Sequence, residues 1–233
     1  MLNSFDTFEL ITKTLVKSCD ALFPTALHAW SEETLALSGA SDTHFGFVQR
    51  GTAVLQTAAG DEFRLGEKMY FCVPGQCSVT GGGGIIVTRF GYRGLFLIGG
   101  RIEENGRLRY IDGCTDTLLI APPVFGDPCL NALYFPRNIR QTPHTHPSVR
   151  VGIIASGAGE CVLSDRTIAL AAGQAFIIAP HARHSFNTAS DEMIVIAYHP
   201  DSDFGATDKN HPMVNRTMVE GVSAAALAEI RTV

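Results

Sequence analysis

Short apolar runs alternate with turn-forming residues along most of the chain. The runs are rich in Val, Ile, Phe and Thr, and Gly, Pro and Asn separate them, a pattern typical of β-strands joined by turns. The clearest runs are HFGFVQRGTAVLQT (44–57), KMYFCV (68–73), GIIVTRFGY (84–92), RVGIIASGAGECVL (150–163), QAFIIAP (174–180) and MIVIAY (193–198). The pattern predicts an all-β protein.

Helical spacing occurs only near the two ends. Apolar residues recur at helical intervals between residues 6 and 18, which favours a helix there. These residues are Phe8, Ile11, Leu15 and Val16. Near the other end, the segment SAAALAEI begins at Ser223, a residue type preferred at helix N-caps. We therefore expect a short helix at each end of the chain.

A weak internal repeat organises the strands. Residues 46–78 can be laid on residues 152–185, and both copies read as strand, Gly turn, strand, Gly and strand. The aligned pairs are Gly46 with Gly152, Gly51 with Gly157, Gly66 with Gly173, and Cys77 with His184. Two similar β-units in tandem are the simplest interpretation.

Two turn-rich segments add detail to this division. The Pro-rich stretch APPVFGDP (121–128) predicts the linker, which gives an N-terminal unit of residues 1–120 and a C-terminal unit of residues 121–233. Asn105 and Gly106 lie between two short extended runs, and this dipeptide predicts a β-hairpin.

Composition and charge narrow the class of protein. The chain has 233 residues, 45% of them hydrophobic, which is enough for a substantial core. Its net charge of −5 offers no basic surface, so no nucleic-acid partner is expected. The longest uncharged run (69–88) contains five Gly and one Pro, which favours strands and turns over a membrane span.

Cysteine usage and the first residues bear on localisation. Six cysteines are scattered without CxxC pairs, a distribution that favours reduced thiols over a disulfide framework. The first residues lack the uninterrupted apolar core of a signal peptide. We therefore expect a cytoplasmic protein without a membrane partner.

Six of the eight histidines lie between residues 144 and 211. His144 and His146 are separated by one residue, and Arg150 follows. If this segment is a strand, all three side chains leave the same face, because successive residues of a strand alternate sides. Two imidazoles on one face suggest a metal site. The permanent positive charge of Arg150 beside them either argues against a metal site or serves a different function.

The spacing of these residues resembles the cupin family, small β-barrels of jelly-roll type that carry two motifs. The first motif is H-x-H, three or four residues, E, six residues, G; the second is G, five residues, P-x-G-x-x-H. The first is matched at every spacing by His144, His146, Arg150 and Gly157, with Arg in place of Glu. The second is matched in spacing by Gly173 and His184, although the Pro is shifted to Pro180 and His181 replaces the usual Gly.

The resemblance covers residues 144–200 and reaches residues 38–90 only through the internal repeat. It implies a bicupin, that is, two tandem jelly-roll barrels. The motif positions of the first copy hold Ser38 and Ala40 for the two histidines, His44 for Arg150, and Cys77 for His184. We therefore expect a degenerate N-terminal barrel that covers sheet edges or forms a dimer interface.

In the second barrel, His144, His146 and His184 are the predicted metal ligands. Three imidazoles suit Fe²⁺, Zn²⁺, Ni²⁺, Mn²⁺ or Cu²⁺ and leave coordination positions open for substrate or O₂. Cupins with three-His iron sites, such as the thiol, diketone-cleaving and gentisate-type dioxygenases, imply Fe²⁺ first. The alternative is that the three histidines are ordinary polar residues of a surface strand.

Arg150 cannot replace the Glu ligand, because guanidinium has no lone pair to donate. Its natural partner is a carboxylate or phosphate held by two parallel hydrogen bonds. One hypothesis is therefore that Arg150 holds the acidic end of a substrate. The other is that it forms an ion pair with a buried acid such as Glu160 or Asp191.

Two further histidines are candidates for catalysis. His181 precedes His184 by three residues in a loop, where it could move protons or simply face solvent. His199 ends a strand and could reach the cavity as a base or a fourth ligand.

Three functions remain open on the sequence. The first is an iron dioxygenase-type oxidoreductase that acts on a small carboxylate. The second is a redox-neutral, metal-dependent isomerase or lyase, and the third is a bicupin that binds a small ligand without catalysis. Each of them implies a small anionic metabolite as ligand, and a spare barrel with free strand edges favours a homodimer.

Overall fold

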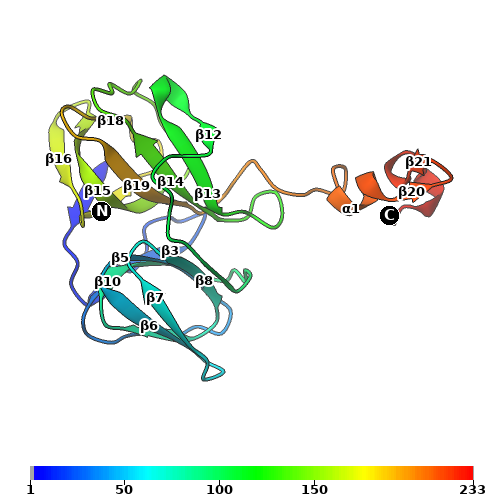
Figure 1. The fold of residues 1–233 in the computed structure, drawn as a ribbon, viewed down its shortest axis with the longest axis horizontal. Coiled ribbons are helices and arrows are strands. Elements are labelled where there is room, and N and C mark those ends of the chain that lie inside the picture. The colour runs from blue at the N-terminus through cyan, green and yellow to red at the C-terminus, as the bar shows by residue number, and fades with distance from the viewer. Residues whose placement is uncertain (1–2, 233) are drawn as a thin grey trace.

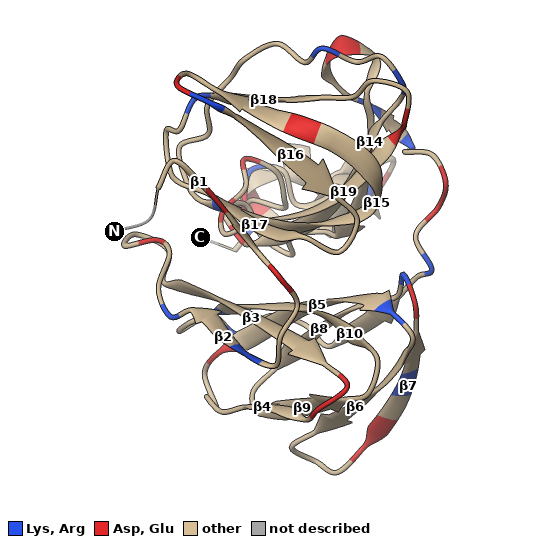
Figure 2. Ribbon diagram, turned by 90° about the vertical axis from the view of Figure 1, so that its left-hand side faces the viewer, with Lys and Arg blue, Asp and Glu red and all other residues tan. Residues whose placement is uncertain are grey.

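The chain forms two stacked β-barrels and a C-terminal arm that extends away from them (Figures 1 and 2). The computed structural model describes residues 3–232. Acidic and basic positions are interspersed along the ribbons of both barrels in the view of Figure 2. No helix among these residues is long and apolar enough to cross a membrane.

Two sheets make up the first barrel. Its strands are β2 (Lys13–Val16), β3 (Thr25–Ser31), β4 (Leu35–Leu37), β5 (Thr43–Arg50), β6 (Thr52–Thr57), β7 (Glu62–Gly66), β8 (Tyr70–Pro74), β9 (Cys77–Thr80), β10 (Gly83–Arg89) and β11 (Leu97–Gly99). One sheet has the order β11-β8-β5-β10-β3-β2, and the other has the order β4-β9-β6-β7.

The second barrel is organised around one long strand. Its elements are β1 (Phe5–Phe8), β12 (Leu108–Arg109), the 3-10 turn η1 (Ile111–Gly113), β13 (Thr115–Ile120), β14 (Cys129–Phe135), β15 (Arg150–Leu163), β16 (Thr167–Ala171), β17 (Ala175–Ile178), β18 (His184–Asn187) and β19 (Met193–His199). The sheet order is β1-β17-β15-β19-β14-β13-β12, and the far half of β15 pairs with β16 and β18. The predicted all-β fold with two tandem jelly-roll barrels is confirmed.

The internal repeat is visible in the register of the two barrels. Gly46 in β5 is opposite Phe71, and Gly152 in β15 is opposite Phe176. Both glycines are required, because an added Cβ would lie 2.0 Å from the Phe71 ring in the first barrel and 2.6 Å from the Phe176 ring in the second. The same Gly–Phe contact therefore recurs in both barrels.

One pair in the sequence alignment of the two units, Gly66 with Gly173, does not match in the structure. Gly173 has a φ of +90° and donates its N–H to Ile154 O at 2.8 Å. The residue that does the same in the first barrel is Lys68, with a φ of +66° and an N–H bond to Val48 O at 2.8 Å. Lys68, not Gly66, is therefore the counterpart of Gly173, and the left-handed position tolerates a side chain in one copy.

The predicted boundary at residues 120 and 121 does not coincide with the strand pairing. β13 and β14, on either side of residues 121–128, pair with each other, so this Pro-rich stretch connects two strands of the second barrel. The chain passes between the barrels at residues 100–107 instead, and β1 pairs with β17 of the second barrel. Proline marks a loop, but loops within a barrel carry the same signal as linkers.

The hairpin predicted at Asn105 and Gly106 is also wrong, because residues 101–107 contain no strand. Gly106 serves a close approach of two backbones: a Cβ there would lie 2.4 Å from the backbone nitrogen of Asp116. Its N–H donates to Thr115 Oγ1 at 3.1 Å.

The helix predicted over residues 6–18 is replaced by the edge strands β1 and β2. Residues 5–8 pair antiparallel with β17, with Phe5 opposite Ile178 and Phe8 opposite Ala175. Thr12 further fixes the extended backbone, because its Oγ1 donates to Ser31 O at 3.1 Å and accepts from Ser31 N at 3.0 Å. Pairing with a sheet edge therefore overrides the helical spacing.

The arm contains α1 (Pro212–Arg216), β20 (Met218–Val219), β21 (Val222–Ser223) and the 3-10 turns η2 (Ala224–Ala226) and η3 (Ala228–Ile230). Ser223 is the N-cap of η2, and its hydroxyl accepts from Ala225 N at 3.2 Å. The predicted cap is therefore confirmed, although it opens a single 3-10 turn and not an α-helix.

Three apolar clusters hold the barrels together. One cluster fills the first barrel around Trp30, and a second fills the other barrel around Phe176. The third lies between the barrels, where the rings of Phe45 and Tyr198 are 5.0 Å apart. Central strands such as β5 are therefore buried on both faces, which explains their nearly continuous apolar runs.

The inter-barrel cluster predicts a large loss of stability from one substitution. Phe45 is only 2% exposed, so Phe45→Ala should lower the free energy of unfolding by about 3–5 kcal/mol in urea denaturation. Leu22, which is 82% exposed, provides the matched control: Leu22→Ala should stay within about 0.5 kcal/mol of the parent. Equal effects of the two changes would contradict the inter-barrel core.

Candidate metal centre

Three histidines converge at one end of the second barrel. His144 and His184 pair through a two-way backbone bridge, with N–H to O distances of 2.9 and 3.0 Å. The ring centroids are 4.7 Å apart for His144 and His184, 5.0 Å for His144 and His146, and 5.2 Å for His146 and His184. One nitrogen of each ring lies within 4.8 Å of the others.

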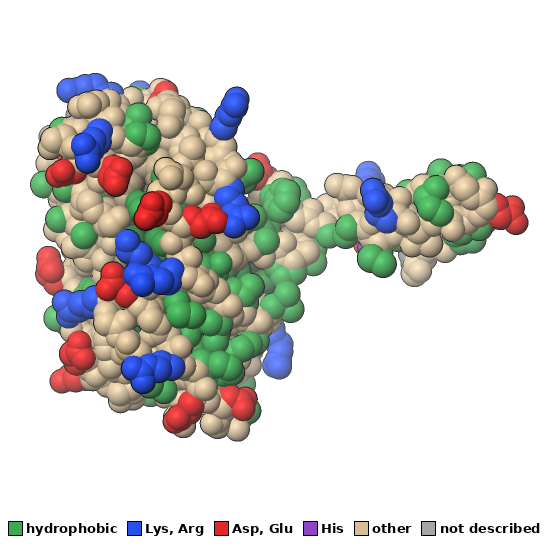
Figure 3. Space-filling view, in the orientation of Figure 1, with side chains coloured by type: hydrophobic (Ala, Val, Ile, Leu, Met, Phe, Trp, Pro, Cys, Tyr) green, Lys and Arg blue, Asp and Glu red, His purple; other side chains and the backbone are tan. Residues whose placement is uncertain are grey.

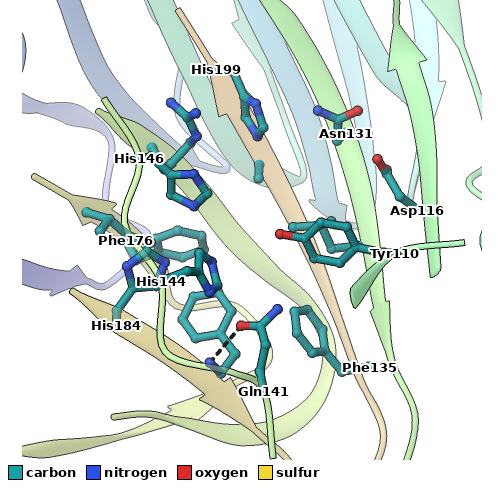
Figure 4. Close-up of a pocket in the computed structure, with 15 residues that line it drawn as sticks. Tyr110, Asp116, Asn131, Phe135, Gln141, His144, His146, Phe176, His184 and His199 are labelled. Carbon is teal, nitrogen blue, oxygen red and sulfur yellow. Dashed lines mark hydrogen bonds between the residues drawn. The ribbon is translucent and has the colours of Figure 1, made fainter. Parts of the chain in front are cut away.

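The predicted set of three imidazoles is therefore brought together in space (Figure 4). The segment that carries His144 and His146 is not the regular strand that was expected. It contains a single β-bridge at His144, followed by a bend before β15 begins at Arg150. The two histidines reach the same cavity from an extended loop.

Hydrogen bonds orient two of the rings. His144 Nδ1 lies 2.8 Å from Thr142 O, and His184 Nδ1 lies 2.9 Å from Ala182 O. Donation of Nδ1–H to a carbonyl leaves the lone pair on Nε2, which is the common arrangement of metal-binding histidines. His146 is positioned through its backbone, because His146 O accepts the N–H of His181 at 2.8 Å.

Burial keeps two of these imidazoles neutral. Burial, together with the nearby Arg150 guanidinium, lowers the pKa of His146 to about 3. Burial likewise lowers the pKa of His184 to about 4, against the opposing effect of the Ala182 carbonyl. Both nitrogen lone pairs are therefore free at neutral pH, and the donor set fits a transition metal.

Two adjoining cavities contain the site. The inner one, of about 70 Å³, is lined by the three histidines and by Tyr110, Asp116, Asn131, Leu133, Phe135, Gln141, Arg150, Phe176, Ile178, Phe186, Ala197 and His199. The outer one, of about 490 Å³, shares four of these residues, namely Asp116, Asn131, Arg150 and His199. A metal fits in the inner cavity, and a larger ligand would extend into the outer one.

Arg150 is 9% exposed and lines both cavities. Its Nη1 donates to Ser148 Oγ at 2.7 Å, Val149 O at 3.0 Å and Ser148 O at 3.2 Å. Asp201 Oδ1, which accepts from the Ser148 hydroxyl, is 3.9 Å from Nη1. The suggested partners Glu160 and Asp191 are therefore wrong, and Asp201 is the acid near this cation.

The opposite edge of the Arg150 guanidinium is free. Its Nε is buried and has no hydrogen-bond partner among residues 3–232. A guanidinium held only through Nη1 keeps its Nε–Nη2 edge for two parallel hydrogen bonds to a carboxylate.

The two predicted catalytic histidines have different positions. His199 lines both cavities, and its ring centroid is 6.4 Å from that of His146. Burial and the Arg150 charge hold the pKa of His199 well below its ordinary value. His181, in contrast, is exposed and absent from the lining of either cavity, so its expected place near the reacting groups is wrong.

The left-handed backbone of His181 explains its outward side chain. With a φ of +61°, the residue forms the turn before β18, and its N–H is used to hold His146. The loop between β17 and β18 thus supports a predicted ligand through its backbone.

Sequence reasoning missed three polar residues of the cavity, namely Asp116, Asn131 and Gln141. Gln141 Oε1 accepts from Phe186 N at 3.0 Å and thereby ties the loop before His144 to β18. Asp116 is an acid within the apolar strand β13, TDTLLI, and that contrast was the available signal.

The first barrel lacks a corresponding centre. Cys77 and Leu37 are paired where the second barrel pairs His184 and His144, and both belong to the apolar core. His44, at the position of Arg150, lies 2.8 Å from Thr88 Oγ1, which also lies 3.0 Å from His28 Nε2. A degenerate, packed N-terminal barrel was the prediction, and this geometry agrees with it.

Comparison with known proteins supports the fold assignment. A family model described as the cupin domain matches residues 133–199. Curated proteins give no significant match.

Three solved structures resemble most of the chain. The putative glyoxylate induced protein from Pseudomonas aeruginosa has a TM-score of 0.59 and 12% identity, and the match covers 88% of this chain and 83% of that one. Protein Ylba from E. coli has a TM-score of 0.56 and 17% identity, with 88% and 85% covered. Salicylate 1,2-dioxygenase from Pseudoaminobacter salicylatoxidans, solved as gentisate adducts, has a TM-score of 0.56 and 12% identity, with 76% and 68% covered. At these identities the likeness shows the fold alone. Residues 133–199 therefore form a cupin domain, and the whole chain has the two-barrel fold of cupin proteins.

Proposed function

We propose that this protein is a metal-dependent enzyme that acts on a small carboxylate-bearing substrate in its second barrel. The observation that carries the proposal is the convergence of His144, His146 and His184, whose neutral imidazoles leave coordination positions open. A bound metal would supply Lewis acidity and a template for the substrate. The protein would supply orientation through Arg150 and exclusion of water through the apolar wall.

Iron is the proposed metal, and a dioxygenase-type oxidation is the proposed reaction. Three imidazoles and no carboxylate among the clustered ligands are compatible with Fe²⁺, and salicylate 1,2-dioxygenase shares the fold. Zn²⁺, Ni²⁺, Mn²⁺ or Cu²⁺ in place of iron would favour a redox-neutral isomerase or lyase. Ligand binding without turnover would favour a non-catalytic bicupin.

The metal itself gives the first test. Protein expressed in medium supplemented with iron and zinc should contain about one metal ion per chain by elemental analysis, because one barrel has the ligands. His146→Ala should reduce this content to a small fraction. His181→Ala is the matched control, since His181 is exposed outside the cavities, and it should keep the metal. A metal-free parent protein, or equal loss in both variants, would contradict the site.

Arg150 provides the second test. Arg150→Gln removes the Nε–Nη2 edge of the guanidinium and should leave the metal content unchanged. It should raise KM for a carboxylate substrate about 10-fold to 100-fold, because a charge-assisted pair of hydrogen bonds to the substrate is lost. Oxygen consumption over a panel of small acids that includes salicylate and gentisate would identify that substrate. Arg137→Gln, at an exposed arginine of the same barrel, should leave KM unchanged. An unchanged KM in Arg150→Gln would exclude the anion-binding role.

We also propose that the chain forms a homodimer through its arm. The arm exposes several apolar side chains, and apolar side chains are also visible at its base (Figure 3). Met213 is 69% exposed, Met218 59% and Ile230 53%. Burial of these groups against a second copy would remove them from water.

Light scattering on a sizing column tests the dimer. The expected mass is about 50 kDa, twice that of the 25.1 kDa chain. Truncation after residue 205 should halve this mass without loss of the metal, because all three ligands precede the cut. A monomeric full-length chain would contradict the proposal.

A further inference from the structure

Asp116 occupies an unfavourable position for an acid. It lies in β13, where its cross-strand neighbours are Leu133 in β14 and Leu108 in β12, and neither can hydrogen-bond to it. Aspartate is also among the residues least favoured in strands. In Figure 4 its side chain lies across the cavity from the three histidines, near Asn131.

Among residues 3–232 the carboxylate has no side-chain partner. Its Oδ1 is buried without a hydrogen bond, and no ion pair involves this residue within residues 3–232. Burial raises the pKa of Asp116 to about 6, against the opposing effect of the Thr117 backbone. Titratable groups from several elements lie near it or line the same cavities. They are Tyr110 from the loop before η1, Cys129 and Tyr134 from β14, Arg150 from β15, His199 from β19, the three clustered histidines, and Asp201 and Asp203 after β19.

A half-buried carboxylate costs stability when its lost hydration is offset only in part, and here the Thr117 backbone is the one opposing effect. Asp116 is the one acid among the residues that line the inner cavity, and it also lines the outer cavity. Such a group is explained most simply by chemistry that needs it.

We propose that Asp116 is the proton-transfer residue of the second-barrel site. With the substrate carboxylate on Arg150, a hydroxyl of the same molecule lies between the imidazoles and Asp116. The O–H bond of the substrate breaks, the proton forms an O–H bond with Oδ1 of Asp116, and the electron pair stays on the substrate oxygen. The carboxyl group then returns the proton to the product.

This assignment rests on the proposed function and narrows its substrate class. The ligand must carry a hydroxyl in addition to a carboxylate, because Arg150 binds the charge and Asp116 needs a proton donor. Its remaining atoms would occupy the outer cavity, where Leu118 and Phe204 provide apolar contacts.

The first experiment needs no substrate. Between its ordinary pKa of 3.8 and the native value of about 6, Asp116 binds more proton in the folded than in the unfolded state. Stability contributed by this group therefore falls as pH rises through that window. Asp116→Asn removes the penalty, so its Tm should exceed that of the parent by about 2–4 °C at pH 7.5 and approach it near pH 4.

The second experiment measures turnover of the metal-loaded protein with glycolate, lactate, salicylate and gentisate. Asp116→Asn should keep its metal content and lower kcat at least about 100-fold with little change in KM, because general acid–base catalysis contributes about 10²–10⁴-fold. The rise of kcat/KM between pH 5 and pH 7 should be lost as well. Asp191→Asn, at an exposed acid outside both cavities, should match the parent throughout.

Four outcomes would overturn the proposal. A lower Tm for Asp116→Asn at pH 7.5 would make the residue structural, and loss of metal would make it a ligand. A kcat within about 3-fold of the parent would exclude proton transfer. If metal-loaded parent protein turned over none of the four acids, the proposed hydroxy-acid chemistry would be overturned. If the parent protein bound no metal at all, the proposed function would be contradicted instead.

Discussion

The two-way backbone bridge between His144 and His184 is the constraint on which the site depends. It closes the loop before β15 against β18 and places two imidazoles on one wall. Carbonyl groups of Thr142 and Ala182 then fix both rings through Nδ1, and the N–H of His181 holds the backbone at His146. The convergence of the three histidines therefore follows from the backbone and carbonyl hydrogen bonds of the barrel.

Comparison of the barrels shows how one framework serves two purposes. By strand register, the first-barrel positions of Asn131, Arg150 and His199 hold His28, His44 and Thr88. In the first barrel the Thr88 hydroxyl lies within hydrogen-bond distance of both His28 and His44 and so links the two imidazoles. In the second barrel the corresponding three line cavities. The first barrel joins these polar side chains to one another through Thr88, while the second directs them into cavities.

The sequence was sufficient for features set by local spacing. Strand periodicity and the internal repeat punctuated by glycines predicted the two barrels, and the spacing of His144, His146 and His184 predicted the cluster. Features decided by long-range pairing could not be predicted. The helical spacing in residues 6–18 gave way to pairing with two sheets, and the Pro-rich loop at 121–128 was indistinguishable from a linker.

The residues around the three histidines show the same contrast between local spacing and long-range pairing. Arg150 and His199 were identified from their positions in strands, and both line the cavities. The outward direction of His181 depends on a left-handed backbone, and the role of Asp116 depends on which residues pair across β13. Neither feature can be inferred from the sequence on either side of these two residues. Asp201 is likewise 51 positions from Arg150 in the chain and meets it only in the folded barrel.

X-ray absorption spectroscopy of the metal-loaded protein tests the central claim most directly. Three imidazole nitrogens on one ion are expected, and the imidazole contribution should fall to two or disappear in His184→Ala. A spectrum with fewer than three imidazoles in the parent protein, or with sulfur from one of the cysteines, would contradict a metal centre built from residues 144, 146 and 184.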